Sequence, residues 1–561
     1  FSMVILPLLL LMPTSVDALN KKRGSKQVPP SLKGLLATEL LGGDSVWVDP
    51  KFEQRAKHSE KITVTVWFEE QFLGDGAAYL RRAKEFAKSK RRTLRNKTVA
   101  TLKSLSERSW KAAQNDIDKL IKQKTISHVE RHWIINGFTC VLNAKQLESF
   151  KKIKGVKKIF VAQTANRLNR QLPAPQFQKI VKQQKFDPTR YLHPWYSRYL
   201  MADRVWKEFK VNGEGTLNIV HDFNFALSDN VIANIYHNPK EIAGNGKDDD
   251  GNGLIDDYHG YNFTNNTATL TLSSQNKSMR TLHAHQCAAI ICGVGLKDKK
   301  YEFGIAPRGK WAGVIAMGKL EAAIEWAIEQ KADTYSMSFS IPHLGEYRSH
   351  WRKIMEHGSY CGIYFVSGAG NFAQRTQVPV QMRVPEDIPN VVFAAAGVQR
   401  NFSRTPFSSK GPVKWNTEHY NDGMVAKPEV CAFNMGLPLL LLDGKVIPGR
   451  ANGNSFAGPM FCGAIALMLS ADPDLLPWDL REIITSTATD VAAKGVDDET
   501  GHGLINCYRA VKEVLRRKML RDGGDAKPYT GRTKGDTLDI PAILKKLKAS
   551  QLKSASNAAK Q

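Results

Sequence analysis

Two kinds of hydrophobic pattern divide the chain. Over residues 61–163, short apolar strands flank long charged helices, which indicates a small α+β domain. Over residues 200–515, apolar strands and helices alternate, which is typical of the α/β class, with a mostly parallel sheet flanked by helices. In the first domain we expect strands at 62–67, 133–142 and 155–161, helices within 76–123, and a short helix at 144–153. In the second we expect strands at 216–221, 333–340 and 362–367 and helices at 284–291, at 320–329 and after residue 456.

The remaining segments lack this periodicity. Residues 1–18 contain an apolar run followed by Val16-Asp17-Ala18, the small-residue pattern of a signal-peptidase site, with the start of the signal missing. We therefore expect a secreted protein without a membrane anchor. Residues 19–60 are predicted to be a basic linker, 164–199 an exposed processing linker, and 516–561 a disordered basic tail.

Charge and cysteine content change the picture little. The formal net charge is +26, but acidic and basic side chains nearly balance over residues 201–510, so the excess lies in the flanking segments and no nucleic-acid partner is expected. The seven cysteines show no CxxC spacing, and their pairing cannot be read from the sequence.

One serine is the candidate nucleophile. Ser455 stands between the turn residues Gly453-Asn454 and an apolar stretch that predicts a buried helix, with Pro459 in its first turn. Taken alone, a serine in this position only caps the helix. A nucleophilic serine also needs a base, a group that orients the base, and donors for the oxyanion. Asp222, His283 and Asn371 supply these types, each at a predicted strand end or helix start.

With these residues, the chain resembles the subtilisin-like serine proteases, the subtilase family. The chain order Asp, His, Ser is the order known for subtilisin. Family motifs resemble Gly213-Glu214-Gly215 before the strand that ends at Asp222, the run His283 to Ala289, Ala327 to Phe339, Val366 to Asn371, Phe407 to Pro412, Lys427 to Val430, Gly453 to Pro459, and Gly501-His502-Gly503. The resemblance covers roughly residues 200–510.

The resemblance implies a role for each residue. Ser455 would attack the scissile carbonyl, His283 would act as general base and then acid, Asp222 would hold the imidazole, and Asn371 would bind the oxyanion with the Ser455 amide. Cys287 resembles a cysteine of the proteinase K-like branch, which implies inhibition by mercurials; a small core residue is the other interpretation. The substrate-binding residues implied are Ser338, Phe339, Ser340, Gly368, Ala369 and Gly370.

The family also implies that the first domain is a propeptide. Such a domain assists folding and blocks the cleft as an intramolecular inhibitor until it is removed, which makes the protein a zymogen. We expect cleavage within residues 162–195. The alternative is a permanent accessory domain.

An acidic segment suggests a cation site. Asp248, Asp250 and Asn252 alternate before Gly253, with Asp256 beyond, a spacing that resembles the start of an EF-hand loop and suits calcium. Similar insertions in subtilases often bind structural calcium. The alternative is a solvated acidic turn. No organic cofactor is expected.

The sequence therefore predicts a secreted serine endopeptidase that acts on polypeptides. Three departures from the family motifs matter: Phe223-Asn224 after the aspartate, Gln286 in place of the second motif histidine, and Phe456 after the serine. They leave open a catalytically silent binding protein on the same fold. A lipase or esterase is disfavoured, because Ala457 breaks the GxSxG motif and the residue order differs.

Overall fold

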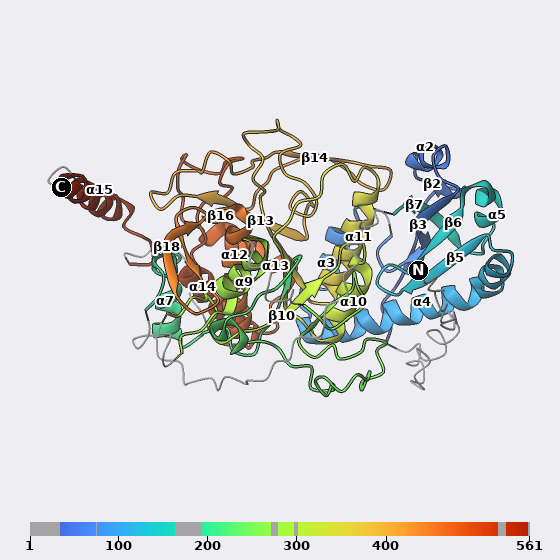
Figure 1. Ribbon diagram of the computed structural model, residues 1–561, viewed down its shortest axis with the longest axis horizontal. Coiled ribbons are helices and arrows are strands. Elements are labelled where there is room, and N and C mark those ends of the chain that lie inside the picture. Colours follow the sequence, from blue (N-terminus) through green and yellow to red (C-terminus); the bar gives the residue numbers. More distant parts are fainter. Residues whose placement is uncertain are drawn as a thin grey trace, which may run out of the picture.

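The computed structural model describes residues 34–74, 76–162, 192–270, 279–296, 301–525 and 535–558. Within these ranges an N-terminal domain, up to residue 162, lies beside a larger domain that begins at residue 192 (Figure 1). The predicted signal segment and most of the predicted processing linker lie outside the described residues.

A seven-stranded parallel sheet forms the centre of the larger domain, in the order β16-β13-β12-β11-β8-β10-β9. Tyr335 of β11, for example, pairs with Ile219 of β8 on one side and Phe365 of β12 on the other. This arrangement, flanked by helices, confirms the predicted fold class. The strands are β8 (Leu217–His221), β9 (Gly260–Asn262), β10 (Lys310–Ile315), β11 (Thr334–Met337), β12 (Tyr364–Gly368), β13 (Val392–Val398) and β16 (Val430–Phe433).

Helices cover both faces of this sheet because successive strand residues point to opposite sides. Thr334 contacts Cys462 of α12, with 2.8 Å between Oγ1 and Sγ. The next residue, Tyr335, points the other way and packs its ring 5.7 Å from that of Phe365, which also contacts Gly358 of α11. One face carries α9 (Met279–Cys292), α12 (Ala457–Ala471) and α14 (Cys507–Arg521), and the other carries α10 (Leu320–Glu329) and α11 (Tyr347–Tyr360).

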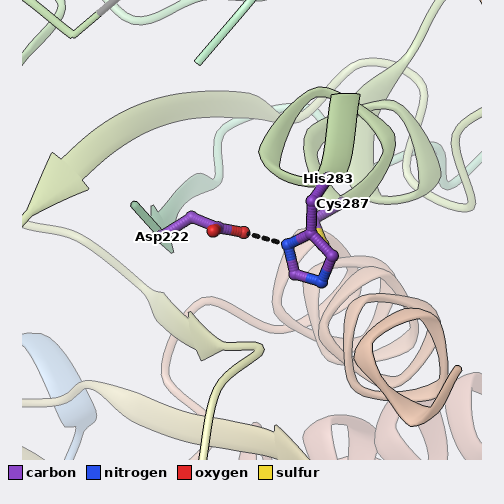
Figure 2. A group of neighbouring side chains, drawn as sticks. All are labelled: Asp222, His283 and Cys287. Atoms are coloured by element: carbon purple, nitrogen blue, oxygen red, sulfur yellow. Dashed lines mark hydrogen bonds and ion pairs between the residues drawn. The ribbon is translucent and has the colours of Figure 1, made fainter. Parts of the chain in front are cut away.

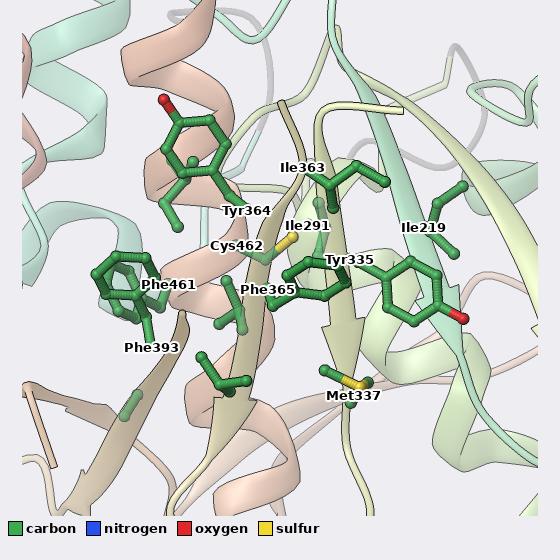
Figure 3. Packing of buried hydrophobic residues seen from close by; sticks show 14 of the residues in the cluster. Ile219, Ile291, Tyr335, Met337, Ile363, Tyr364, Phe365, Phe393, Phe461 and Cys462 are labelled. Atoms are coloured by element: carbon green, nitrogen blue, oxygen red, sulfur yellow. The ribbon is translucent and has the colours of Figure 1, made fainter. Parts of the chain in front are cut away.

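Helix α12 is buried, as predicted, and it is the central element of the core. It packs against the sheet, α9 and α14, and Figure 3 shows Phe461 beside Phe393 of β13, with ring centroids 6.1 Å apart. Of the residues that the structure describes, the stretch Asn454–Ala471 is long and apolar enough to cross a membrane, but 89% of it is buried inside the protein. Its apolar character is therefore that of a core helix.

The N-terminal domain has a five-stranded sheet in the order β2-β7-β3-β6-β5, with α4 packed on one face. Its own core includes Ile117 of α4 and Phe138 of β6. The elements are β1 (Glu39–Leu40), β2 (Trp47–Val48), α2 (Lys51–Ala56), β3 (Lys61–Phe68), β4 (Glu70–Gln71), α3 (Ala78–Glu85), α4 (Arg91–Lys122), β5 (Ile126–His132), β6 (Gly137–Asn143), η1 (Ala144–Gln146), α5 (Leu147–Phe150) and β7 (Val156–Val161).

The structure corrects the predicted start of this domain. Part of the expected linker 19–60 belongs to the fold, because β2 pairs with β7 and Phe52 of α2 is buried in the domain core. These elements are too short to show a periodic pattern. Strand β5 was not predicted, because it is an edge strand whose polar residues alternate poorly.

Two further boundaries differ from prediction. Residues 192–199, expected in the linker, belong to the larger domain, where Tyr196 of α6 (Trp195–Tyr199) is buried. The tail expected to be disordered contains the end of α14 and the helix α15 (Ile540–Ala558), whose Ile543 packs against the core. The basic residues of α14 have partners, since Arg516 pairs with Glu513 at 2.6 Å and Arg521 with Asp472 at 2.7 Å.

The other elements of the larger domain connect or border the sheet. They are α7 (Ala202–Arg204), η2 (Val205–Phe209), α8 (Asp229–Ile232), β14 (Val413–Asn416), β15 (Asn421–Val425), β17 (Leu437–Leu440), β18 (Val446–Ala451), η3 (Asn454–Phe456) and α13 (Pro477–Thr487).

Candidate active site

The predicted aspartate and histidine are hydrogen-bonded to each other. Asp222 directly follows β8, and its amide donates to Val314 O of β10 at 3.0 Å, which fixes its backbone at the carboxyl edge of the sheet. Its side chain is buried, and Oδ2 lies 2.7 Å from Nδ1 of His283 on α9 (Figure 2). The other oxygen, Oδ1, accepts the amide hydrogen of Phe223 at 2.7 Å. Both carboxylate oxygens therefore have a partner, and the imidazole is held by one of them.

This contact sets the state of His283. Because Asp222 accepts at Nδ1, Nδ1 carries the hydrogen and Nε2 is the nitrogen left to accept a proton. Burial lowers the pKa of His283, but the negative charge of Asp222 and its hydrogen bond raise it by more, so the net pKa is above the ordinary histidine value. A base with a raised pKa takes up a proton readily, as a general base must.

Ser455 lies beside this pair at the start of the core helix. It is in η3, and its neighbour Phe456 packs its ring 5.8 Å from that of His283. Two hydrogen bonds hold the backbone of this turn: Ser455 O accepts from Ser338 Oγ at 2.8 Å and from Cys287 Sγ at 3.5 Å. The hydroxyl of Ser455 donates to Ser338 O at 3.5 Å. Within the described residues no hydrogen bond joins this hydroxyl to His283.

Asn371 is exposed next to the serine, with its amide orientation fixed. Its Oδ1 accepts the backbone hydrogen of Asn454 at 2.9 Å, an assignment that leaves the Nδ2 donors facing away from that contact. The amide of Ser455 lies in the first turn of a helix, where N–H groups have no intrahelical partner. An oxyanion bound at this point would receive both donors.

The comparison with protein families agrees with this geometry. A family model described as "Subtilase family" matches residues 191–503, more than half of the chain. The chain belongs to the subtilase family. This match confirms the predicted family.

The subtilase is similar to several curated proteins. It is 25% identical over 313 residues to Subtilisin-like protease 1 of Plasmodium berghei, covering 51% of this chain and 47% of that protein. It is 22% identical over 531 residues to Bacillopeptidase F of Bacillus subtilis (87% and 34%) and 28% identical over 189 residues to Subtilisin E of the same species (34% and 43%). The chain spans less than half the length of these relatives. A crystal structure of MycP1 with its N-terminal propeptide removed matches 57% of the chain and 98% of its own, at 20% identity and a TM-score of 0.42.

Each departure from the subtilase motifs has a structural partner. Phe223, 43% exposed, packs its ring 5.8 Å from that of Phe339, and the turn after Asp222 needs no left-handed residue at 223 or 224. Gln286 donates to Pro438 O at 2.9 Å and accepts from Leu440 N at 3.0 Å, which ties α9 to β17. Phe456 packs beside His283. The Phe223-Asn224 turn thus leaves Asp222 within reach of the histidine.

Asn454 is a positioning residue that sequence reasoning missed. Besides its backbone bond to Asn371, its Nδ2 donates to Gly370 O at 2.5 Å and Ser408 Oγ at 3.0 Å, and its Oδ1 accepts from Asn434 Nδ2 at 2.6 Å. It therefore holds the turn that carries Ser455 against Gly370 and Asn371. In the sequence, Gly453-Asn454 indicates only a turn. The burial of Asn454, which the sequence pattern does not show, distinguishes it from an ordinary turn residue.

The predicted substrate-binding residues lie on neighbouring strand ends. Ser338, Phe339 and Ser340 follow β11, while Gly368, Ala369 and Gly370 follow or end β12, the strand paired with it. A side chain at Gly368 would meet Asn454 O at 2.0 Å, so glycine is needed for the serine turn to approach. The two segments and Ser455 therefore share one edge of the sheet, where ligands of open α/β sheets gather.

The cysteines are not used for cross-linking in this structure. All seven are free and buried. Burial raises the pKa of Cys287 far above the ordinary thiol value, so it remains protonated and acts as a donor to Ser455 O. Its Sγ, Asp222 and His283 each offer a ligand atom within 4.8 Å of the others, which is the arrangement that a thiol-seeking metal would meet (Figure 2).

The acidic segment converges differently from prediction. Asp248 accepts from the Asn252 and Gly253 amides, and Asp256 from the Asn245 and Gly246 amides, so both carboxylates stabilise turns. Asn252 is likewise used within the loop: its Oδ1 accepts the Leu254 amide hydrogen and its Nδ2 donates to Asp257.

The carboxylates that do meet are those of Glu241, Asp250 and Asp257, with ligand oxygens within 4.8 Å of one another. Glu241 Oε2 is buried without a hydrogen-bond partner in the described part of the chain. Burial, together with the charges of Asp257 and Asp250, raises the pKa of Glu241 to about 7. Asp250 is thus the one residue common to the predicted and the observed group.

Proposed function

We propose that this subtilase is a serine endopeptidase that hydrolyses polypeptides through an acyl-enzyme. The 2.7 Å hydrogen bond between Asp222 and His283, beside Ser455, carries this proposal. Ser455 Oγ attacks the scissile carbonyl carbon while Nε2 of His283 takes its proton. Asn371 Nδ2 and the Ser455 amide bind the oxyanion. His283 then donates the proton to the leaving amine, and water releases the acyl group by the same steps in reverse.

Replacing the nucleophile tests this proposal. The Ser455→Ala chain is expected to lose casein hydrolysis, while Ser470→Ala, a change of a partly buried serine near the other end of the same helix, keeps it. A serine-directed inhibitor should abolish the activity of the unmodified chain. If neither the unmodified chain nor Ser455→Ala cleaves casein, the silent binding protein is the better description.

The N-terminal domain is proposed to be an intramolecular inhibitor. It docks on α10 and α11, which lie on one face of the sheet and which precede and follow β11 in the sequence. Lys51 reaches His343 O at 3.0 Å and Leu344 O at 3.2 Å, just beyond those residues. Trp67 donates to His350 Nδ1 at 3.0 Å. The domain thus borders the segment that would bind substrate.

Its contacts combine apolar packing with buried charges. Lys353 is buried and donates to Leu73 O at 2.9 Å and Gly74 O at 2.7 Å. Arg91 and Asp333 form a 2.6 Å ion pair with 5% and 9% of their side chains exposed. Such groups are readily hydrated once separated, which suits a domain that leaves after cleavage better than a permanent one.

Maturation of the expressed chain tests this role. The unmodified chain should cut itself within residues 162–195 and gain activity when the N-terminal fragment dissociates; the Ser455→Ala chain should stay intact. N-terminal sequencing locates the cut. Active material that begins near residue 19 would instead support a permanent accessory domain. Secretion, supported by the apolar run at residues 4–12 and the pattern Val16-Asp17-Ala18, is checked in the same culture by assaying the medium.

We further propose that Glu241, Asp250 and Asp257 hold a structural calcium ion. Carboxylate oxygens are the ligands that calcium prefers, and the unpartnered Oε2 of Glu241 supports an additional cation there. EDTA should lower the melting temperature of the unmodified protein and leave that of Glu241→Gln almost unchanged. The control Glu418→Gln, at a surface position away from the cluster, should respond to EDTA as the unmodified protein does. Equal responses of the unmodified protein and Glu241→Gln would contradict the site.

A further inference from the structure

A buried glutamate lies against both segments of the predicted substrate pocket. Glu386 is fully buried, and its Oε1 accepts from Ser340 Oγ at 2.6 Å and from the Arg383 amide at 3.1 Å. A Cβ added to Gly370 would stand 2.9 Å from the same oxygen. Ser340 and Gly370 belong to the two strand ends that are predicted to bind substrate, and the carboxyl group lies against both.

The second oxygen of this carboxyl group is unused. Glu386 Oε2 is buried and has no hydrogen-bond partner among the described residues. A buried polar atom without a partner costs about 1–3 kcal/mol. A ligand atom that donates to Oε2 would remove this cost, whereas a purely apolar group would leave it.

Nearby cations do not neutralise Glu386. The guanidinium of Arg383 stacks on Phe372, 3.6 Å from the ring centroid. Among the described residues, Arg383 forms no ion pair with Glu386. The neighbouring carboxylate, Asp387, faces Arg348 instead, at 3.9 Å. Glu386 is therefore a buried acid that lies against Ser340 and Gly370 and lacks a counter-charge among the described residues.

We propose that Glu386 determines the specificity of the pocket and selects substrates with lysine or arginine immediately before the scissile bond. This inference rests on the proposed endopeptidase function. The ammonium or guanidinium group donates to Oε2, while Ser340 keeps Oε1 in place. An apolar side chain fills the pocket but leaves Oε2 unpartnered, and an acidic side chain meets a group of its own charge.

The charge state of Glu386 gives the selection a measurable pH dependence. Burial raises its pKa to about 8, although the hydrogen bond from Ser340 lowers it. The carboxylate that attracts a cation therefore forms as pH rises through about 8. Below this pH the ionised fraction falls about tenfold per unit, and the preference for a cationic side chain should fall with it.

Two matched peptides test the inference. They differ only in lysine or norleucine before the scissile bond, so the side chains have the same carbon chain with and without the ammonium group. The ratio of their kcat/KM values, measured with the mature enzyme from pH 6 to 9, cancels the ionisation of His283. The ratio is expected to rise about tenfold per unit up to about pH 8 and then level.

Variants assign the effect to Glu386. Glu386→Gln should lower the ratio at pH 8.5 at least tenfold and remove its pH dependence. Asp387→Asn should keep the preference for lysine but move its pH dependence to lower pH, because the charge of Asp387 raises the pKa of Glu386. An unchanged ratio in Glu386→Gln, or a pH-independent ratio in the unmodified enzyme, would overturn the inference while leaving the protease function intact. If Glu386→Gln does not fold, the pH profile of the unmodified enzyme tests the inference by itself. An enzyme that cleaves neither peptide nor casein would refute the proposed function, and this inference with it.

Discussion

Acidification is expected to release the N-terminal domain, because His357 joins the two domains only in its neutral form. His357 Nε2 accepts the amide hydrogen of Leu73 at 3.2 Å, and Nδ1 donates to Ile134 O at 2.5 Å; both partners belong to the N-terminal domain. Burial, together with the charge of Lys353, lowers the pKa of His357 to about 3. Protonation at Nε2 would direct its new N–H against the N–H of Leu73.

The sign and size of the effect follow from this pKa. It is depressed in the docked state from 6.5, so the docked state binds fewer protons than the separated one. The stabilisation is fully present above pH 6.5 and is lost as pH falls toward 3. Each unit within this window costs about 1.4 kcal/mol, or about tenfold in the dissociation constant. At pH 4.5 the loss is about 2.7 kcal/mol, or about 100-fold.

The assay uses a Ser455→Ala chain with a specific cleavage site introduced between residues 163 and 191. After cleavage, the dissociation constant of the two fragments is measured from pH 7.5 to 4.5. His132 and His419, whose pKa values burial also lowers, steepen the dependence. His357→Gln, whose amide can still accept and donate, should therefore flatten it by about tenfold per unit, and His58→Gln, at an exposed position, should not. Equal slopes for the unmodified and His357→Gln chains would refute the reasoning.

Three other changes have defined outcomes. Asn371→Ala should lower kcat about 100- to 1000-fold with little change in KM, the cost known for this asparagine in a subtilisin itself; steady-state kinetics with an unchanged kcat would argue against its role. Arg91→Ala leaves Asp333 buried and unpaired and should cost about 3–5 kcal/mol in denaturant unfolding, against less than about 1 kcal/mol for Arg92→Ala, whose side chain is 68% exposed. Gly458→Ala brings a Cβ to 2.7 Å from Gly368 N, so its melting temperature should fall by several degrees, whereas Gly42→Ala, with nothing within 4 Å, should melt normally.

The catalytic constellation could be predicted because its residues stand at element boundaries with strong local patterns. Asp222 follows an apolar strand, and Ser455 precedes an apolar helix, so topology alone brings them to one edge. The edge strand β5 shows no such pattern, because it pairs with a neighbouring strand on one side only and its residues are mostly polar. The two-residue strand β2 is specified by its pairing with β7, a contact distant in sequence.

The acidic loop shows why residue type and spacing do not define a ligand set. Asp248 and Asp256 have the expected chemistry, but the turns bend their carboxylates toward backbone amides. Glu241 lies outside the patterned segment, yet the fold brings it to Asp250 and Asp257. Side-chain direction here depends on turn conformation, which the sequence pattern does not contain.

The departures from the family motifs lose their force as an argument for a silent protein once their contacts are considered. That argument required the Phe223-Asn224 turn to hold Asp222 away from His283, yet their side chains meet at 2.7 Å. Phe223 is 43% exposed and packs on Phe339, a predicted substrate-binding residue, so its effect is expected on substrate binding and not on the Asp222–His283 contact. The change after the aspartate is therefore best interpreted as an alteration of what the cleft binds. Glu386 behind the same pocket points to the same conclusion, since both residues alter the substrate surface around an unaltered pair of acid and base.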